Sequence, residues 1–202
     1  MPLIPTVMSM QMVAKGASLT LAGSKYNPMV SAVSMATCSY IMASSMAQTT
    51  NQVTGPGAGT FQGKIVGCTS SGMSGLMKLK AASGGLSGRD IGKLFDSIAF
   101  GVVQSLNTVM VVGSVIGGGP GAGQGKVLML IPTALQAVII ANLAGKVIAG
   151  SKTAQLVSAI AFGICNHIMT AGMITATCIG AFAGPPVGPV PLPVAPGIGK
   201  LV

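Results

Sequence analysis

The chain has 202 residues, of which half are hydrophobic, 6% are charged and 3% are aromatic. Soluble globular proteins carry about 25% charged residues, so we expect most of this surface to face lipid, other subunits or the chain itself. The net charge is +9, but the cations are spread singly and Trp is absent, so no nucleic-acid partner is expected, because such a partner calls for a clustered basic patch and stacking aromatics.

Internal repeats organise the sequence. A shift of 127 residues places 130–133 on 3–6, and a shift of 62 residues places the Ile-Ala-Phe-Gly of 160–163 on that of 98–101. The chain is therefore predicted to be a single domain, 1–202, made of three repeats and a Pro-rich closing segment. The repeats span residues 1–54, 55–118 and 119–182, and the closing segment spans 183–202.

Each repeat is predicted to contain a short strand followed by two helices. The apolar runs 65–66 and 127–131 are too short for a helix and predict strands. The first helices are expected near residues 7–21, 72–85 and 134–148, with N-caps at Thr6, Ser71 and Thr133.

The second helices are predicted to start after a glycine break and to run to about residues 48, 112 and 178. The breaking glycines are Gly23, Gly88 and Gly150.

The repeats are predicted to close on themselves. The first repeat has no strand segment at its own start, so residues 199–202 are expected to fill that place beside residues 1–6. The fold class predicted is mainly α, with three tandem strand–helix–helix repeats closed into a pseudo-threefold ring by short strands and Gly/Pro-rich loops. The candidate closure joints are Gly63, Lys64, Gly125, Lys126, Gly199 and Lys200.

A glycine-rich stretch, 119–126, has the composition of a phosphate-binding loop but not its pattern. Pro120 stands where that motif requires Gly, and Val127 stands where it requires Ser or Thr. No catalytic residue and no cofactor-binding residue is predicted, and the protein is not expected to be an enzyme.

His167 is the single histidine of the sequence, and the repeat aligns it with Tyr40 and Ser105. We interpret these three residues as a candidate polar layer, in which the side chains bond one another or water. A metal shared between His167 and Cys165 or Cys38 is the alternative, but no further ligand stands at a suitable spacing. No metal is therefore predicted.

Two functions suit this composition. The first is structural, because a sparsely charged chain suits burial in a large complex, and repeated faces suit the axis of a trimeric assembly. The second is an integral membrane protein with three helical hairpins, such as a small channel or lysis-type pore, because 154–180 exceeds the roughly 18 apolar residues that span a bilayer. Against the second, the first helices are short and carry lysines, and no Trp/Tyr belt is present.

Some of these motifs resemble a known family. The Gly-x-Gly-Lys run at 123–126, the repeated Ile-Ala-Phe-Gly, and the endings 184–190 and 199–202 resemble the small hydrophobic structural proteins of large contractile-tailed phages. The resemblance implies a tail or baseplate component of the virion, at the hub or central tip, with a trimeric hub or spike and other virion proteins as partners. It assigns no active residue, and it is compatible with the protein meeting the host membrane during infection.

Overall fold

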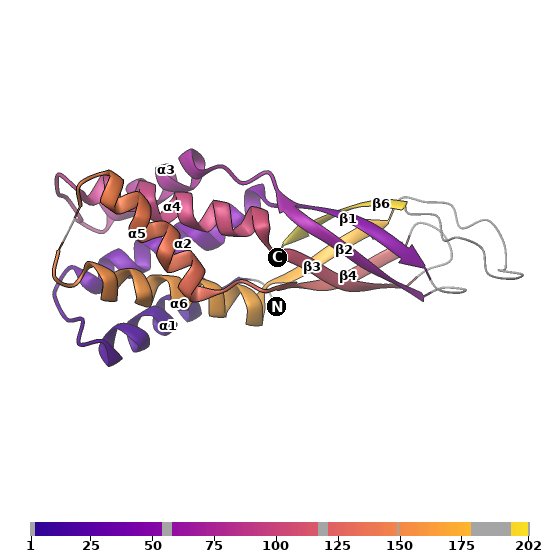
Figure 1. The fold of residues 1–202 in the computed structure, drawn as a ribbon, viewed down its shortest axis with the longest axis horizontal. Helices are drawn as coiled ribbons and strands as arrows, with labels where there is room; N and C mark the ends of the chain where they lie inside the picture. Colours follow the sequence, from indigo (N-terminus) through magenta and orange to yellow (C-terminus); the bar gives the residue numbers. More distant parts are fainter. Residues whose placement is uncertain (1–2, 54–57, 117–120, 149, 179–194, 202) are drawn as a thin grey trace, which may run out of the picture.

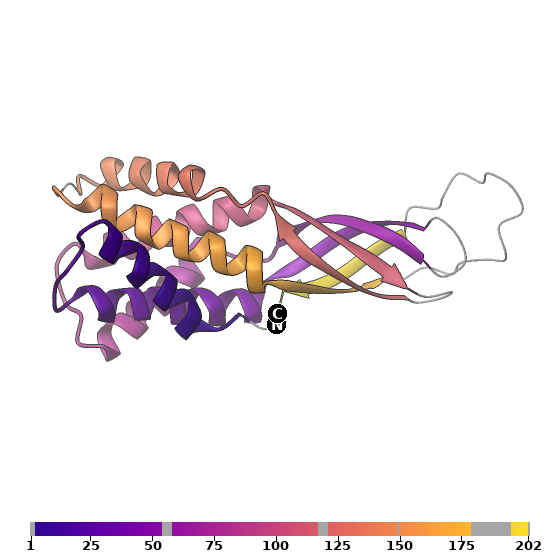
Figure 2. The ribbon, with the colours of Figure 1, turned by 90° about the horizontal axis from the view of Figure 1, so that it is seen from below.

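The computed structural model describes residues 3–53, 58–116, 121–148, 150–178 and 195–201. The described part is elongated, with helices in one half and strands in the other (Figure 1). The described chain begins and ends where these halves meet, as both ribbon views show (Figures 1 and 2).

Short and long helices alternate along the chain. The short helices are α1 (Pro5–Ser18), α3 (Ser70–Ser83) and α5 (Pro132–Gly145). The long helices are α2 (Tyr26–Ser44), α4 (Ile91–Thr108) and α6 (Thr153–Ala171). Each helix contacts the next one, and α6 contacts α1, so the six helices form a closed bundle.

The strands form a closed antiparallel barrel in the order β1 to β6. The strands are β1 (Met46–Val53), β2 (Ala58–Val66), β3 (Met110–Ile116), β4 (Gly121–Leu128), β5 (Met173–Cys178) and β6 (Ala195–Leu201). The last strand, β6, pairs with both β5 and β1, with Gly199 opposite Ala47. Residues 199–201 therefore close a barrel of strands rather than a ring of helices.

The predicted fold class is wrong. The chain is mixed α and β, not a mainly α pseudo-threefold ring of strand–helix–helix repeats, because two strands follow each pair of helices. The second helices end at Ser44, Thr108 and Ala171 instead of near 48, 112 and 178. The residues that follow are rich in Val, Ile and Thr, whose branched side chains lose freedom in a helix and pack well on a pleated sheet.

The N-caps of the short helices lie two residues before the predicted positions Thr6, Ser71 and Thr133. Their N-caps are Ile4, Thr69 and Ile131. The Oγ1 of Thr69 accepts a hydrogen bond from the Gly72 N–H at 3.3 Å. The other two helices start with Pro5 and Pro132, where the missing N–H leaves no hydrogen bond unmade.

The short helices also end differently from the prediction. Each is followed by a residue with positive φ, and these residues are Thr20, Gly85 and Val147. The predicted helix breakers lie three residues further on, at Gly23, Gly88 and Gly150, and their carbonyls accept hydrogen bonds from the first residues of α2, α4 and α6. The left-handed position after the helix is thus filled by glycine in one hairpin and by β-branched residues in the other two.

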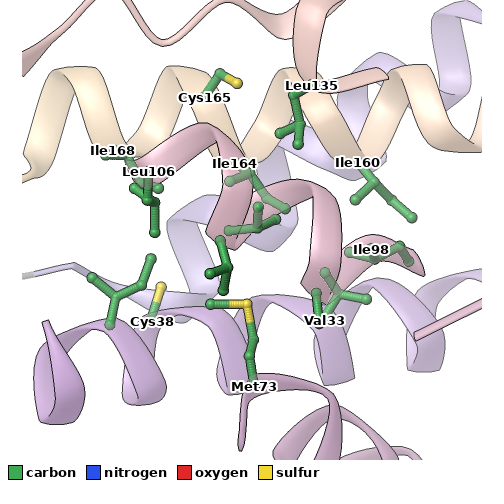
Figure 3. Packing of buried hydrophobic residues seen from close by; sticks show 14 of the residues in the cluster. Val33, Cys38, Met73, Ile98, Leu106, Leu135, Ile160, Ile164, Cys165 and Ile168 are labelled. Carbon is green, nitrogen blue, oxygen red and sulfur yellow. The ribbon is translucent and has the colours of Figure 1, made fainter. Parts of the chain in front are cut away.

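The bundle core is a continuous apolar cluster (Figure 3). Side chains from α2 to α6 point into it, including Val33, Ile98 and Ile160. The repeated glycines Gly101 and Gly163 let neighbouring short helices approach closely, because a Cβ there would meet Ile139 of α5 or Met12 of α1. This close approach gives the repeated Ile-Ala-Phe-Gly motif a packing role.

The barrel core depends on one aromatic ring. Phe61 of β2 is fully buried, and the register places it opposite Gly113, which in turn lies opposite Gly125. A Cβ on either glycine would meet the Phe61 ring. A barrel of eight strands is just wide enough to be filled by side chains, so this narrower barrel needs glycines around its one large ring.

Candidate interaction surface

Exposed apolar side chains gather where the bundle meets the barrel. Met46 and Met110 begin β1 and β3, Leu128 ends β4, and Met129 follows it with 71% of its surface exposed. Ile4 and Ile131 precede α1 and α5. We call these six residues the collar. Exposed apolar patches of this kind mark contacts with proteins or membranes.

Lysines border the collar on the outer face of the barrel. Lys64 is exposed and lies opposite Met110 in the pairing of β2 with β3. Lys126 is exposed and lies opposite Met173 in the pairing of β4 with β5. Because residues directly opposite in an antiparallel pair share one face, each lysine lies next to a methionine that begins a strand.

The carboxylates of the chain lie elsewhere. The sequence has two acidic residues, Asp90 and Asp96, and neither is in a strand. Asp90 pairs with Lys93 at 3.1 Å, and Asp96 pairs with Lys78 at 2.6 Å. Among the described residues, the lysines of the barrel therefore have no side-chain carboxylate as a partner.

Polar, uncharged side chains make up much of the remaining outer face of the described barrel. They carry amide or hydroxyl groups and are Gln48, Thr60, Gln62, Ser114, Gln124 and Thr175. Inward residues alternate with them, as Phe61 and Ile65 alternate with Gln62 and Lys64 along β2. Apart from the buried hydroxyl of Thr49, the described inside of the barrel is thus apolar, and its outside carries hydrogen-bonding groups.

The candidate closure joints all lie in strands. Gly63 and Lys64 are in β2, Gly125 and Lys126 in β4, and Gly199 and Lys200 in β6. The structure separates them along the sheet, because β3 lies between β2 and β4 and β5 lies between β4 and β6. The three joints share one pattern: each is a glycine followed by a lysine, and the lysine lies nearer to the collar.

The candidate polar layer is spread over the three long helices. His167 of α6 is 1% exposed, and its Nε2 accepts a hydrogen bond from the Ile4 N–H at 2.9 Å. Tyr40 of α2 does the same for the next short helix, since its hydroxyl accepts from the Thr69 N–H at 3.0 Å. Ser105 of α4 is half-buried. The two aromatic side chains therefore hold the N-caps of α1 and α3.

The environment of His167 keeps it neutral. Burial lowers the pKa of its imidazole, because the charged form loses its hydration. Its Nδ1 is buried and has no hydrogen-bond partner among the described residues. Since Nε2 accepts the Ile4 N–H, the proton of the neutral ring is assigned to Nδ1.

The buried thiols of Cys38 and Cys165 stay protonated in this setting. Burial raises the pKa of Cys38 and of Cys165 to about 12, so neither thiol is ionised at neutral pH. Figure 3 shows them on opposite sides of the core cluster. In the described part of the chain, no three His, Cys, Asp or Glu side chains gather as a metal site would require.

A shallow pocket of about 220 Å³ lies between α3, α4 and α5. Its lining residues are Ser70, Ser71, Asp96, Phe100, Asn142 and Lys146. Burial acts to raise the pKa of Asp96, but hydrogen bonds from Lys78 and Ser74 and the nearby positive charges leave it lowered. The carboxylate is thus ionised and already bound within the protein, which suits a link between helices better than acid–base catalysis.

Sequence reasoning missed the collar, although the repeats carried a signal for its two strand-starting methionines, Met46 and Met110. Met46, Met110 and Met173 recur at separations of 64 and 63 residues and each begins a strand. Without the strand boundaries, these methionines read as part of the second helices.

One helix in the described part, α6, is long and apolar enough to cross a membrane, and half of its apolar stretch is buried within the protein. Comparison with known proteins finds no matching family model, no matching curated protein and no matching solved structure.

Proposed function

We propose that the protein is a non-enzymatic structural component of a contractile-tailed phage particle, placed on the tail or baseplate axis at the hub or central tip. In this role it packs against a trimeric hub or spike. The observation that carries the proposal is the collar. Its six exposed apolar residues lie at the junction of bundle and barrel in an elongated molecule, and such residues suit a contact with another protein. The resemblance of its motifs to small hydrophobic virion proteins supplies the setting.

The alternative is an integral membrane protein with three helical hairpins. The apolar character of α6 favours it. The short helices count against it, because each has 14 residues and so spans about 21 Å, less than the roughly 30 Å core of a bilayer.

The experiment is mass spectrometry of purified particles, with the collar variant Met129→Glu made in parallel. We expect the wild-type protein in the particles and a loss of the variant from them, because a carboxylate in an apolar contact is costly. Leu79→Glu is the matched control, since Leu79 is 64% exposed on α3, outside the collar, and it should be incorporated normally. Absence of the wild-type protein from particles, with recovery in carbonate-washed membranes, would favour the membrane alternative.

A further inference from the structure

The lysines beside the collar indicate the chemistry of the surface that it meets. We propose that the barrel and collar bind an acidic protein surface, in which carboxylates meet Lys64 and Lys126 while apolar side chains meet the collar. This inference rests on the proposed function and deepens it, because it specifies the partner that the proposed function requires.

Charge is the first argument. Lys64 and Lys126 are exposed, and the six strands contain no acidic residue. Lysines of the bundle are used differently: Lys25 donates to the Gly85 carbonyl at 3.2 Å, and Lys152 donates to the Thr20 carbonyl at 2.8 Å. The ion pairs of the described residues involve Lys78 and Lys93 of the bundle, so the barrel lysines are cations that an acidic partner can neutralise without breaking an internal ion pair.

Geometry is the second argument. Lys64 shares the outer face with Met110 directly opposite, so the aliphatic part of the lysine can lie along the methionine while its ammonium group stays in the solvent. The collar thus has an apolar centre bordered by positive charge. Protein interfaces have this arrangement, with an apolar core and a polar rim.

Other partner classes fit the barrel less well. Barrels that face lipid are apolar outside, whereas this one carries exposed Gln48, Gln62 and Gln124. Single-stranded nucleic acids stack on exposed aromatic rings, whereas Phe61, the one aromatic residue in the six strands, is buried. A second copy that presented the same lysines would be repelled.

The first test measures binding of the purified full-length protein to fluorescent poly-L-glutamate at low and high salt. We expect Lys64→Glu to weaken binding at least about tenfold, because it places like charges opposite one another. Lys80→Glu is the matched control, since Lys80 is exposed on α3 away from the barrel, and it should change affinity less than about twofold. Lys64→Arg should bind as the wild type does.

Two results of this test would overturn the proposal. One is an equal loss of affinity for Lys64→Glu and Lys80→Glu, which would show that only net charge matters. The other is binding to phosphatidylglycerol vesicles or duplex DNA that depends on Lys64, without binding to poly-L-glutamate.

The second test applies a carboxyl-to-amine coupling reagent to purified particles. We expect cross-links from Lys64 or Lys126 to an acidic residue of another protein. If the protein is in the particles but both lysines still react fully with an amine label, the acidic surface is wrong while the structural role stands. If the protein is absent from particles, the structural role fails, and the poly-L-glutamate measurements still decide the charge of the partner.

Discussion

The bundle and the barrel fill their interiors in opposite ways. In the bundle, many side chains of moderate size from all six helices share the core, and glycines serve at isolated points such as Gly101 and Gly163. In the barrel, Phe61 is the one aromatic residue and glycines of two neighbouring strands make room for it. We infer that the bundle can distribute the effect of a substitution over many contacts, whereas the barrel depends on a few positions.

The largest predicted effect tests the barrel. Phe61→Ala removes its one large ring and leaves a space that the glycines cannot fill, so we expect a loss of about 3–5 kcal/mol in the free energy of unfolding. Denaturant unfolding measures it. The control is Phe100→Ala on α4, where the ring is 41% exposed, and a similar loss there would contradict the comparison.

The next effect tests close approach in the bundle. A Cβ at Gly163 would meet Met12, including its backbone nitrogen at 3.1 Å, so Gly163→Ala should destabilise the protein by about 1–3 kcal/mol. The matched substitution is Gly75→Ala in α3, where a Cβ would meet nothing within 4 Å. It should instead stabilise by about 1 kcal/mol, because alanine favours a helix. Equal signs for the two substitutions would show that packing does not decide the outcome.

The third prediction concerns pH and the junction between bundle and barrel. The pKa of His167 is lowered in the folded protein, so the unfolded chain takes up the proton first as the pH falls below about 6.5. The contribution of neutral His167 to the free energy of unfolding is therefore complete above that pH. It decreases as the pH falls toward the lowered pKa of the folded protein, by at most about 1.4 kcal/mol for each unit by which the folded and unfolded pKa values differ. Asp96 titrates below this range, because its pKa is lowered from 3.8.

Chemical denaturation between about pH 5 and about pH 8 measures this effect, because those limits lie roughly one and a half units on either side of the ordinary histidine pKa. The variant His167→Gln keeps a side-chain acceptor for the Ile4 N–H but does not titrate. Its stability should be flat over this range. The same slope in both proteins would remove His167 as the cause.

The smallest effect lies at the far end of the bundle. Val147 is 92% exposed and has a φ of 56°, a left-handed conformation that costs a residue with a Cβ about 1–2 kcal/mol. Val147→Gly should therefore stabilise the protein by up to about 1 kcal/mol in thermal unfolding, since glycine pays more entropy on folding. The reverse substitution at the equivalent turn, Gly85→Val, should destabilise it. A loss of stability in Val147→Gly would indicate that the exposed valine makes a contact of its own.

The sequence predicted the helical hairpins well because their signals are local. Repeats, small residues and the break between helices placed the starts of α1 to α6 within about three residues, whereas the ends of the long helices were predicted four to seven residues too late. The predicted N-caps were displaced because Pro5 and Pro132 can begin a helix without a capping side chain.

The strands that follow the long helices were missed because their identity depends on distant partners. In the sequence, residues 173–178 continue the apolar stretch of α6 without a break. They form a strand because they pair with β4 and β6. The collar was missed for the same reason, because it lies where helices change to strands. Hydrogen bonds such as that from Ile4 to His167 join residues 163 positions apart, and no local pattern reports them.

The pairing of β6 with β1 has a consequence for how the chain reaches its native state. The first strand ends at Val53, and its second partner begins at Ala195. One edge of β1 therefore stays unpaired until almost all of the chain has been synthesised. An unpaired strand edge is a template for association with other chains, and pairings between distant segments form slowly. We therefore expect the nascent protein to be most prone to aggregation just before β6 joins, and co-expression of a chaperone that shields strand edges should raise its yield more than a change in temperature.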